Sequence, residues 1–267
     1  MERRNFATAL GLGIAVAAAT AQPAAAQAAG RSRLAQILER GTIRIGTTGD
    51  FNPMSFRDAG SNDYKGFDID AMVQFAADTG VKVEWVVAEW ATLVAGIASN
   101  RFDIFSGASV SMARAKTAAF SLPYVEAGTV PVALKANAGR FASWDALNAA
   151  GVRVAVSMGT VFDEQARRLF PKAEIRAVQS PATGFQEVLA GRADVTITSN
   201  VEAATLVQRY DQLSLLGKDI AARNRRPFAY VVAQDDPAWL NYVNTWVTLK
   251  RIEGFFDALE AKWLGKA

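Results

Sequence analysis

The most constraining feature of the sequence is an alternation of strand and helix patterns that runs through the first half of the chain and then begins again. Short β-branched strand patterns occur at 42–46, 82–87 and 103–105, and helical spacing of apolar residues occurs at 67–80 and 90–97. Strands that alternate with helices are typical of βαβ units, whose strands lie parallel in one sheet. The first half therefore predicts an α/β fold.

The second half of the chain repeats this alternation. Strand patterns at 152–156, 174–178 and 194–198 alternate with helix patterns at 161–170 and 183–190. The apolar residues of these helix patterns recur at three- and four-residue intervals, as on one face of a helix. The repeated rhythm predicts a second α/β unit that is built like the first.

A short motif that leads from a helix into a strand occurs once in each half. The first copy is Ser99-Asn100-Arg101-Phe102-Asp103, and the second is Ala190-Gly191-Arg192-Ala193-Asp194. Hydroxyl side chains follow each copy, at positions 106, 109 and 111 and at positions 198 and 199. Because ligands of open α/β sheets bind beyond the carboxyl ends of the strands, the two hydroxyl clusters predict a site between two similar lobes.

Two extended runs, at 130–134 and 228–233, predict that the chain passes between the lobes twice. Two amphipathic helices after Pro237 are then expected to return to the first lobe. The predicted division assigns residues 31–132 and 234–267 to lobe 1 and residues 133–233 to lobe 2. Two adjacent crossings form a hinge, which favours closure of the lobes around a ligand.

The first 26 residues have the pattern of a secretory signal peptide. Arg3 and Arg4 precede an apolar run from Phe6 to Ala21, and three alanines at 24–26 form a small-residue cleavage pattern. The alternative is a membrane anchor, but the run is shorter than the ~20 residues that a spanning helix needs. Residues 1–26 are therefore predicted to be a signal peptide, and the mature protein is expected in the periplasm.

The composition restricts the chemistry that a site can use. The 267 residues include no histidine and no cysteine, which excludes a Ser-His-Asp triad, a cysteine nucleophile and a thiolate zinc site. Catalysis by carboxylates, lysine, tyrosine or arginine stays open. The net charge of +3 is too small to predict nucleic-acid binding, and no nucleotide-binding glycine motif follows a strand. We expect neither a cofactor nor a metal.

Arg114 is the first candidate for ligand binding. It follows Ser109 and Ser111 directly after a predicted strand, and a guanidinium beside hydroxyls and free amides can clamp a carboxylate, because its fork matches two oxygens. The alternative is an arginine on a solvated helix turn.

Gly159-Thr160 is the second candidate. It lies between a strand and a helix, where the backbone N–H groups of the helix start favour an anion. The alternative is an ordinary turn with a helix cap.

The sequence also suggests apolar walls for the site. Phe51, Phe56 and Trp90 lie near the ends of predicted strands of lobe 1. Aromatic side chains in such places can flank a small ligand, because most of a ligand pocket is apolar. Trp90 is equally compatible with a place in the core.

Several segments carry a family resemblance, in order, over nearly the whole predicted mature chain. They are Gly46–Phe56, Gly66–Asp70, Trp90–Leu93, Arg101–Asp103, Ser109–Arg114, Phe120–Tyr124, Gly159–Thr160 and Gly191–Asp194. This set resembles the polar amino-acid-binding class of periplasmic solute-binding proteins, the extracellular solute-binding proteins of family 3. The resemblance implies a type II periplasmic-binding-protein fold, with two lobes, a hinge and an interlobe ligand cleft. It also implies a monomer that delivers a small carboxylate-bearing solute to the membrane permease of an ABC transporter.

The resemblance implies roles for residues of lobe 1. By the family pattern, Phe51 and Trp90 flank the ligand. Backbone at Ser109, the Ser111 hydroxyl and the Arg114 guanidinium hold its carboxylate or nearby polar groups.

From lobe 2 the resemblance implies a contribution by Gly159-Thr160. Ser199 stands where amino-acid-binding proteins usually carry an Asp that pairs with the α-ammonium group. A zwitterionic ligand would therefore need Glu202 or Asp50 in its place. On this pattern the ligand is an amino acid or a related organic acid, and the sequence does not select one.

Other segments resemble an enzymatic branch of the same fold, the periplasmic cyclohexadienyl dehydratases, which convert prephenate or arogenate. The matching segments are 47–51, 83–86 and 198–202. In that branch a Glu at the position of Glu202 acts as general acid on the leaving hydroxyl, and such a mechanism needs neither His nor Cys. The alternative role of Glu202 is that of a first-turn residue favoured by the helix dipole.

Two departures separate this chain from the dehydratase pattern. The branch usually reads Gly-Gly-Thr-Asn-Glu where this chain has the segment 159–163, and Glu-Arg where it has Ala113-Arg114. We therefore expect a transport-binding protein without a catalytic residue. The dehydratase, with Glu202 as general acid, is the alternative, and a receptor-type ligand sensor would share the same binding chemistry.

Overall fold

The computed structural model describes residues 31–216 and 222–265. The predicted signal peptide, residues 1–26, lies outside the described residues. None of the helices in the described part of the chain is both long and apolar enough to cross a membrane.

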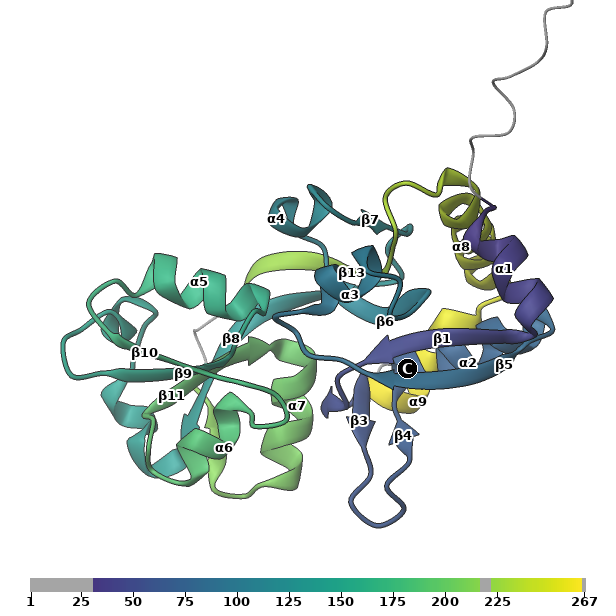
Figure 1. Ribbon diagram of the computed structural model, residues 1–267. Helices are drawn as coiled ribbons and strands as arrows, with labels where there is room; N and C mark the ends of the chain where they lie inside the picture. The colour runs from purple at the N-terminus through teal and green to yellow at the C-terminus, as the bar shows by residue number, and fades with distance from the viewer. Residues whose placement is uncertain (1–30, 217–221, 266–267) are drawn as a thin grey trace, which may run out of the picture. The chain divides into compact units, whose positions relative to one another are not determined.

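One large mixed sheet runs through the molecule. Its strands lie in the order β10-β9-β11-β8-β13-β6-β1-β5, and two short strands, β7 and β12, pair with β13 and β8 (Figure 1). A small sheet is formed by β2, β3 and β4. The bounds are β1 (Thr42–Thr47), β2 (Asp50–Phe51), β3 (Ser55–Arg57), β4 (Tyr64–Lys65), β5 (Lys82–Val87), β6 (Ile104–Ser109), β7 (Ala119–Phe120), β8 (Val125–Leu134), β9 (Arg153–Ser157), β10 (Glu174–Val178), β11 (Val195–Ser199), β12 (Leu213–Leu215) and β13 (Arg223–Val232).

The two ends of the sheet are built alike. β1 pairs in parallel with β5 and β6, and β9 pairs in parallel with β10 and β11. β6 is antiparallel to β13, β11 is antiparallel to β8, and β8 and β13 are antiparallel to each other in the middle. The chain has a two-lobe fold of the periplasmic-binding-protein type, and β8 and β13 are the two extended connections between its lobes. The lobe borders at 132/133 and 233/234 stay a prediction.

Every helix predicted from the sequence is present, and the structure adds helices that were not predicted, α4 among them. Their bounds are α1 (Arg33–Arg40), α2 (Phe67–Thr79), α3 (Leu93–Ala98), α4 (Met112–Ala115), α5 (Val161–Leu169), α6 (Gly184–Leu189), α7 (Asn200–Arg209), α8 (Pro237–Ile252) and α9 (Phe255–Leu264), with 3₁₀ turns at Lys135–Arg140 and Asp145–Leu147. α1 was not expected from the sequence. The helix predicted at 90–97 begins only at Leu93, because Trp90 lies in the preceding turn, where its indole bonds to Asp50.

The apolar residues form separate core clusters in the two lobes. In lobe 1, Phe75 on α2 packs edge-to-face against Trp239 and Trp246 of α8. In lobe 2, Trp144 stacks on Phe170 beside the buried strands β9 and β11. The helices α8 and α9 therefore cover the sheet of lobe 1, which is the arrangement expected from their apolar spacing.

The aspartate that ends the recurring Arg-x-Asp motif has the same structural role in both lobes. Asp103, at the start of β6, accepts the backbone N–H of Arg44 at 2.8 Å and an Nη2–H of the same guanidinium at 2.8 Å. Asp194, at the start of β11, accepts the backbone N–H of Arg153 at 2.9 Å and an Nη2–H of that guanidinium at 3.1 Å. Each buried carboxylate thus joins the residue before one strand to an arginine of the neighbouring parallel strand, and the predicted echo between the lobes is confirmed.

Candidate functional site

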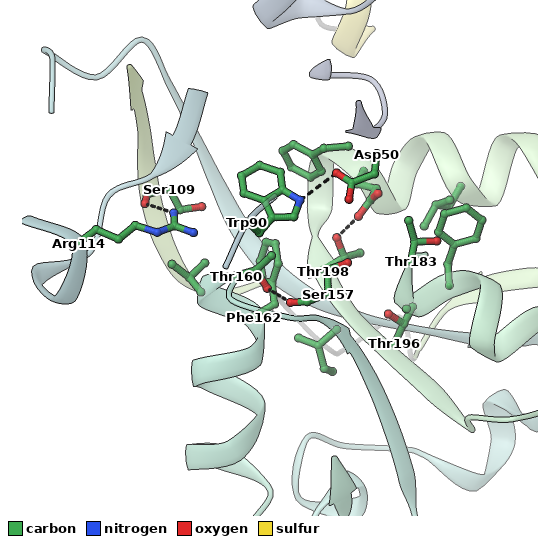
Figure 2. A pocket seen from close by; sticks show the side chains of 17 residues that line it. Asp50, Trp90, Ser109, Arg114, Ser157, Thr160, Phe162, Thr183, Thr196 and Thr198 are labelled. Carbon is green, nitrogen blue, oxygen red and sulfur yellow. Dashed lines mark hydrogen bonds between the residues drawn. The ribbon is translucent and has the colours of Figure 1, made fainter. Parts of the chain in front are cut away.

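A cavity lies where the carboxyl ends of the parallel strands of the two lobes meet. It encloses about 550 Å³, including space that is open to solvent. Side chains from both lobes point into it (Figure 2). Its lining residues are Asp50, Phe51, Trp90, Ser109 and Arg114 of lobe 1, and Ser157, Thr160, Val161, Phe162, Thr183, Gly184, Phe185, Thr196, Ile197, Thr198, Glu202 and Leu206 of lobe 2.

Arg114 and Glu202 occupy equivalent positions in the two lobes. Ser111 caps α4, directly after β6, by accepting the backbone N–H of Arg114 at 3.3 Å. Ser199 caps α7, at the end of β11, by accepting the backbone N–H of Glu202 at 3.0 Å. Both side chains therefore project from the first turn of a helix that starts at the cavity. The repeated architecture places a cation on one side of the cavity and an acid on the other.

The Arg114 guanidinium is half-buried and bonds only to backbone carbonyls among the described residues. Its Nη1 donates to the Ser109 carbonyl at 3.0 Å (Figure 2), and its Nη2 donates to the Gly159 carbonyl, across the interlobe boundary, at 3.1 Å. Burial lowers the pKa of Arg114 to about 10, and the charge of Arg226 lowers it further while that of Glu164 opposes the shift. The guanidinium is still charged at neutral pH.

A buried acid faces this cation from lobe 2. The Thr198 hydroxyl donates to Glu202 Oε2 (Figure 2). Burial raises the pKa of Glu202 to about 8, and the nearby charge of Asp50 adds to this shift, while the bond from Thr198 opposes it. Removal from water disfavours the charged form of a carboxyl group. Glu202 is therefore largely protonated at pH 7 and can donate a proton or a hydrogen bond.

Asp50 is the second carboxylate of the cavity, and it connects the lobes. Its Oδ1 accepts the indole N–H of Trp90 at 2.9 Å, and its Oδ2 accepts the hydroxyl of Ser180, from lobe 2, at 2.6 Å. Asp50 and Glu202 together form an acid pair in which Asp50 accepts two hydrogen bonds and burial keeps Glu202 largely protonated. Such a pair can accept a hydrogen bond at one oxygen and donate one from another.

Aromatic rings close the lobe 1 side of the cavity. Phe51 and Trp90 meet edge-to-face, with 5.9 Å between ring centroids, and Trp90 packs in turn on Phe105 at 5.7 Å. Trp90 thus contributes both to the cavity wall and to the core beneath it. Phe56, the third aromatic candidate, lines an adjoining cavity instead.

The lobes contact each other around the cavity at several points. Besides the Asp50 and Arg114 contacts, Gln179 donates its amide to Glu89 at 3.0 Å. Gly159 packs against the backbone of Ala91: a Cβ at this position would lie 2.4 Å from the Ala91 Cα, and its φ is +75°. Only glycine fits this close approach without strain. Contact between the lobes therefore explains why the predicted Gly159-Thr160 pair has a glycine at its first position.

The structure brings seven of the ten predicted ligand-binding residues to the wall of one cavity. These are Asp50, Phe51, Trp90, Ser109, Arg114, Thr160 and Glu202. The other three lie beside it. Ser111 and Gly159 line a shallower hollow on the outer side of Arg114, and the Ser199 side chain is fully buried as the cap of α7. Their contact with a ligand stays a prediction.

Sequence reasoning missed several residues of the lobe 2 wall. Phe162, Thr183 and Phe185 line the cavity. They lie at the cap or in the first turn of α5 and α6, where the apolar spacing of the sequence indicated only packing. Ser157, at the end of β9, and Thr196, within β11, were also missed. For Ser157, the position of a hydroxyl at the carboxyl end of a strand is the signal that could have found it, since the same signal selected Thr198. Thr196 is the second residue of β11 and carries no such signal.

Comparison with known proteins adds family information to this geometry. Residues 43–266 match the family described as bacterial extracellular solute-binding proteins, family 3. A cyclohexadienyl dehydratase of Pseudomonas aeruginosa is 32% identical over 239 residues, which cover 87% of this chain and 86% of that protein. The L-cystine-binding protein TcyJ of Escherichia coli is 27% identical over 234 residues, covering 87% of this chain and 86% of its own.

A solved structure has the same fold. The crystal structure of AncCDT-1, an ancestral amino acid-binding protein described as a precursor of cyclohexadienyl dehydratase, is 35% identical in sequence and superposes with a TM-score of 0.81. The match covers 87% of this chain and 100% of that chain. Similarity therefore extends to binding proteins and to an enzyme alike.

Proposed function

The chain belongs to the bacterial extracellular solute-binding proteins of family 3, and we propose that it binds a small carboxylate-bearing solute, an amino acid or a related organic acid, between its two lobes. We propose further that it is the periplasmic substrate-binding component of an ABC transporter. The predicted signal peptide, residues 1–26, supports export, and the family supports delivery to a membrane permease.

The Arg114 guanidinium is the observation that carries this proposal. It lines the interlobe cavity, stays charged at neutral pH, and has no carboxylate partner among the described residues. A half-buried charge without a counter-ion is costly, and a bidentate carboxylate supplies the missing partner. The Gly159 carbonyl, which the guanidinium now contacts, belongs to lobe 2, so a ligand carboxylate at Arg114 would be held where the lobes meet.

The opposite wall fits the polar group of such a solute. Asp50 can accept a hydrogen bond from an ammonium or a hydroxyl group, and a protonated Glu202 can donate one to an oxygen. Phe51 and Trp90 supply an apolar surface for the carbon skeleton. A zwitterionic amino acid satisfies this arrangement with its ammonium group near Asp50, which would take over the role that Ser199 cannot fill. The amino-acid names of the relatives support the same ligand class.

A thermal-shift screen followed by calorimetry tests the proposal. The purified protein is titrated with the twenty amino acids, with small keto and hydroxy acids, and with prephenate. We expect saturable, stoichiometric binding of at least one carboxylate and a rise in the melting temperature with its concentration, since a ligand that binds only the folded state stabilises it. If no carboxylate binds while the protein is folded, the proposal is wrong.

The protonated state of Glu202 favours a second candidate function, a prephenate or arogenate dehydratase. The acid lies in the cavity with a pKa raised to about 8, as a general acid near neutral pH requires. With prephenate, Glu202 would give its proton to the leaving hydroxyl. The C–O bond then breaks to release water, the ring carboxylate leaves as carbon dioxide, and phenylpyruvate is formed. The dehydratase relative supports this candidate.

Incubation with prephenate separates the two candidates. Formation of phenylpyruvate that is lost in Glu202→Gln would establish the dehydratase and displace the transport role. Binding of prephenate or of an amino acid without turnover would support the transport role. Gln208→Ala, at an exposed position of the same helix that lines neither the ligand cavity nor the adjoining one, is a control for non-specific effects on α7.

A further inference from the structure

A second cavity adjoins the ligand cavity on the far side of the acid pair. It encloses about 640 Å³, including space that is open to solvent. The two cavities share the wall residues Asp50, Thr183, Phe185, Glu202 and Leu206. Of these two cavities, Arg114 lines the first and not the second, whereas two other arginines, Arg57 and Arg209, line the second and not the first. The charges therefore alternate along the cleft, from a cation through two acids to two further cations.

The two outer arginines come from different lobes. Arg57 ends β3 of lobe 1, and its guanidinium carbon lies 5.0 Å from the centroid of the Tyr64 ring. Arg209 ends α7 of lobe 2, and its guanidinium carbon lies 5.6 Å from the centroid of the Tyr210 ring. Aromatic faces hold guanidinium groups by cation–π attraction without neutralising their charge. Within the described residues, neither arginine has an ion pair with a carboxylate.

Amide groups and aromatic rings complete the second cavity. The Gln186 carbonyl oxygen accepts the backbone N–H of Thr183 at 2.9 Å, so its NH₂ group stays available as a donor. Asn52 adds a second side-chain amide to the wall. Phe185 and Tyr210 pack together at 5.4 Å between ring centroids and form the apolar part. Donors thus outnumber acceptors at the outer end of this cavity, and the set fits an anionic group.

We propose that the second cavity is a subsite for a second anionic group, so that the preferred ligand is a small diacid that spans both cavities. This inference rests on the proposed function, because one carboxylate of the diacid binds Arg114. The other carboxylate extends past Asp50 and Glu202 and binds between Arg57 and Arg209. Because these two arginines belong to different lobes, the second carboxylate joins the lobes as the first one does at Arg114 and Gly159.

Pairs of ligands that differ only in charge test the inference. The purified protein is titrated by calorimetry with glutarate, adipate, L-glutamate and L-2-aminoadipate, and with the monoamide of each at the ω-carboxyl end. Each amide has nearly the same shape as its diacid but lacks the second charge. We expect at least one diacid to bind about fivefold more tightly than its monoamide at low salt, as one partly exposed charge-assisted pair allows. The ratio should decrease as added salt screens the pair.

Variants locate the effect. Arg57→Gln and Arg209→Gln should each lower the ratio of diacid to monoamide affinity towards one and leave the affinity for the monoamide unchanged. Arg168→Gln, which removes an exposed charge on α5 away from both cavities, should leave the ratio as it is. These variants lie outside the set that contacts the first carboxylate, so their effect is separate from that of Arg114.

The outcomes distinguish this inference from the function beneath it. If monoamides and diacids bind equally well, or if Arg57→Gln and Arg209→Gln weaken both members of a pair alike, the second subsite is wrong while carboxylate binding stands. If no member of any pair binds while another carboxylate from the wider screen does, the second subsite is wrong and carboxylate binding stands; if no carboxylate of either set binds the folded protein, both inferences fail together.

Discussion

Glu202 shows how a single residue acquires chemistry that its sequence context does not reveal. The sequence selected Glu202 by its resemblance to the dehydratases and by its position in the first turn of a helix. The sequence could not predict that Glu202 is protonated, because its protonation depends on burial among Thr198, Asp50 and Leu206, which come from three different elements. Arg114 was easier to predict, because its neighbouring hydroxyls and its place after a strand are local features. Local features select a residue type, whereas the pKa depends on the tertiary environment.

The raised pKa of Glu202 predicts how stability depends on pH. The folded state holds the proton up to about pH 8, whereas the unfolded chain loses it near the ordinary pKa of glutamate, ~4.3. Stability from this group is therefore complete below about pH 4 and is lost as the pH rises towards 8, at about 1.4 kcal/mol per pH unit where only the folded state is protonated. Glu202→Gln should flatten this part of the profile.

Urea unfolding of the ligand-free protein at several pH values between 5 and 8 measures this dependence. The difference in unfolding free energy between the wild-type protein and Glu202→Gln should shrink or change sign as the pH rises. A constant difference across this range would mean that Glu202 is ionised throughout, which would also remove the basis of the dehydratase candidate.

Gly159 gives a residue-level test of lobe contact. In Gly159→Ala the new Cβ would lie 2.4 Å from the Ala91 Cα, so the lobes could not approach to the same distance. We expect ligand affinity to decrease by about tenfold or more, since a backbone clash or strain of this kind costs about 1–3 kcal/mol. Calorimetric titration measures the loss.

Gly151→Ala is the matched control for this substitution. Gly151 has a similar φ of +80°, but a Cβ there would meet nothing within 4 Å. It therefore carries the same backbone strain without the clash between lobes. Equal affinity loss in both variants would show that strain, and not lobe contact, accounts for the effect.

Among the elements, the strands that follow the β-branched runs were predicted well, and the short ones were missed. β1, β5 and β10 begin at the predicted residues and β9 begins one residue later, because β-branched and aromatic residues are enriched in strands. β2, β3 and β4 have two or three residues each, too few to show a periodicity. Yet β2 contributes Asp50 and Phe51, so the sheet that sequence patterns missed positions two site residues.

The paired Arg-x-Asp motifs predict unequal effects on stability. Asp103 is buried and forms ion pairs with Arg33, Arg40 and Arg44, whereas Asp194 pairs with two arginines that are more exposed. Asp103→Asn should lower the free energy of unfolding by about 3 kcal/mol, because it leaves buried charges unpaired. Asp194→Asn should lower it by less, about 1 kcal/mol, because solvent screens its partners.

Urea unfolding at pH 7 compares these two variants with the wild-type protein. Neither carboxylate lines the ligand cavity, so ligand binding by the folded variants should not change. The reverse order of destabilisation, or an effect on ligand affinity that exceeds the effect on stability, would contradict the structural role given to the motif.

For the whole molecule, the doubled strand–helix rhythm was enough to predict two lobes with a site between them. The two crossings were also predicted, although β8 and β13 are longer than the predicted extended runs. The second cavity could not be predicted, because Arg57 and Arg209 lie far apart in the sequence and meet only through the arrangement of the lobes. Symmetry of the fold is readable from local patterns, whereas the shape and charge of the cleft depend on contacts between distant segments.

The central claim is that a ligand carboxylate binds Arg114 between the lobes, and calorimetry of Arg114→Ala tests it most directly. The best carboxylate from the ligand screen is titrated into the wild-type protein, into Arg114→Ala and into Arg168→Ala, a control that removes an exposed arginine of α5. We predict that Arg114→Ala weakens binding by at least ~1.5 kcal/mol, the contribution of a charge-assisted hydrogen bond, while Arg168→Ala changes nothing. An unchanged dissociation constant in folded Arg114→Ala would contradict the account.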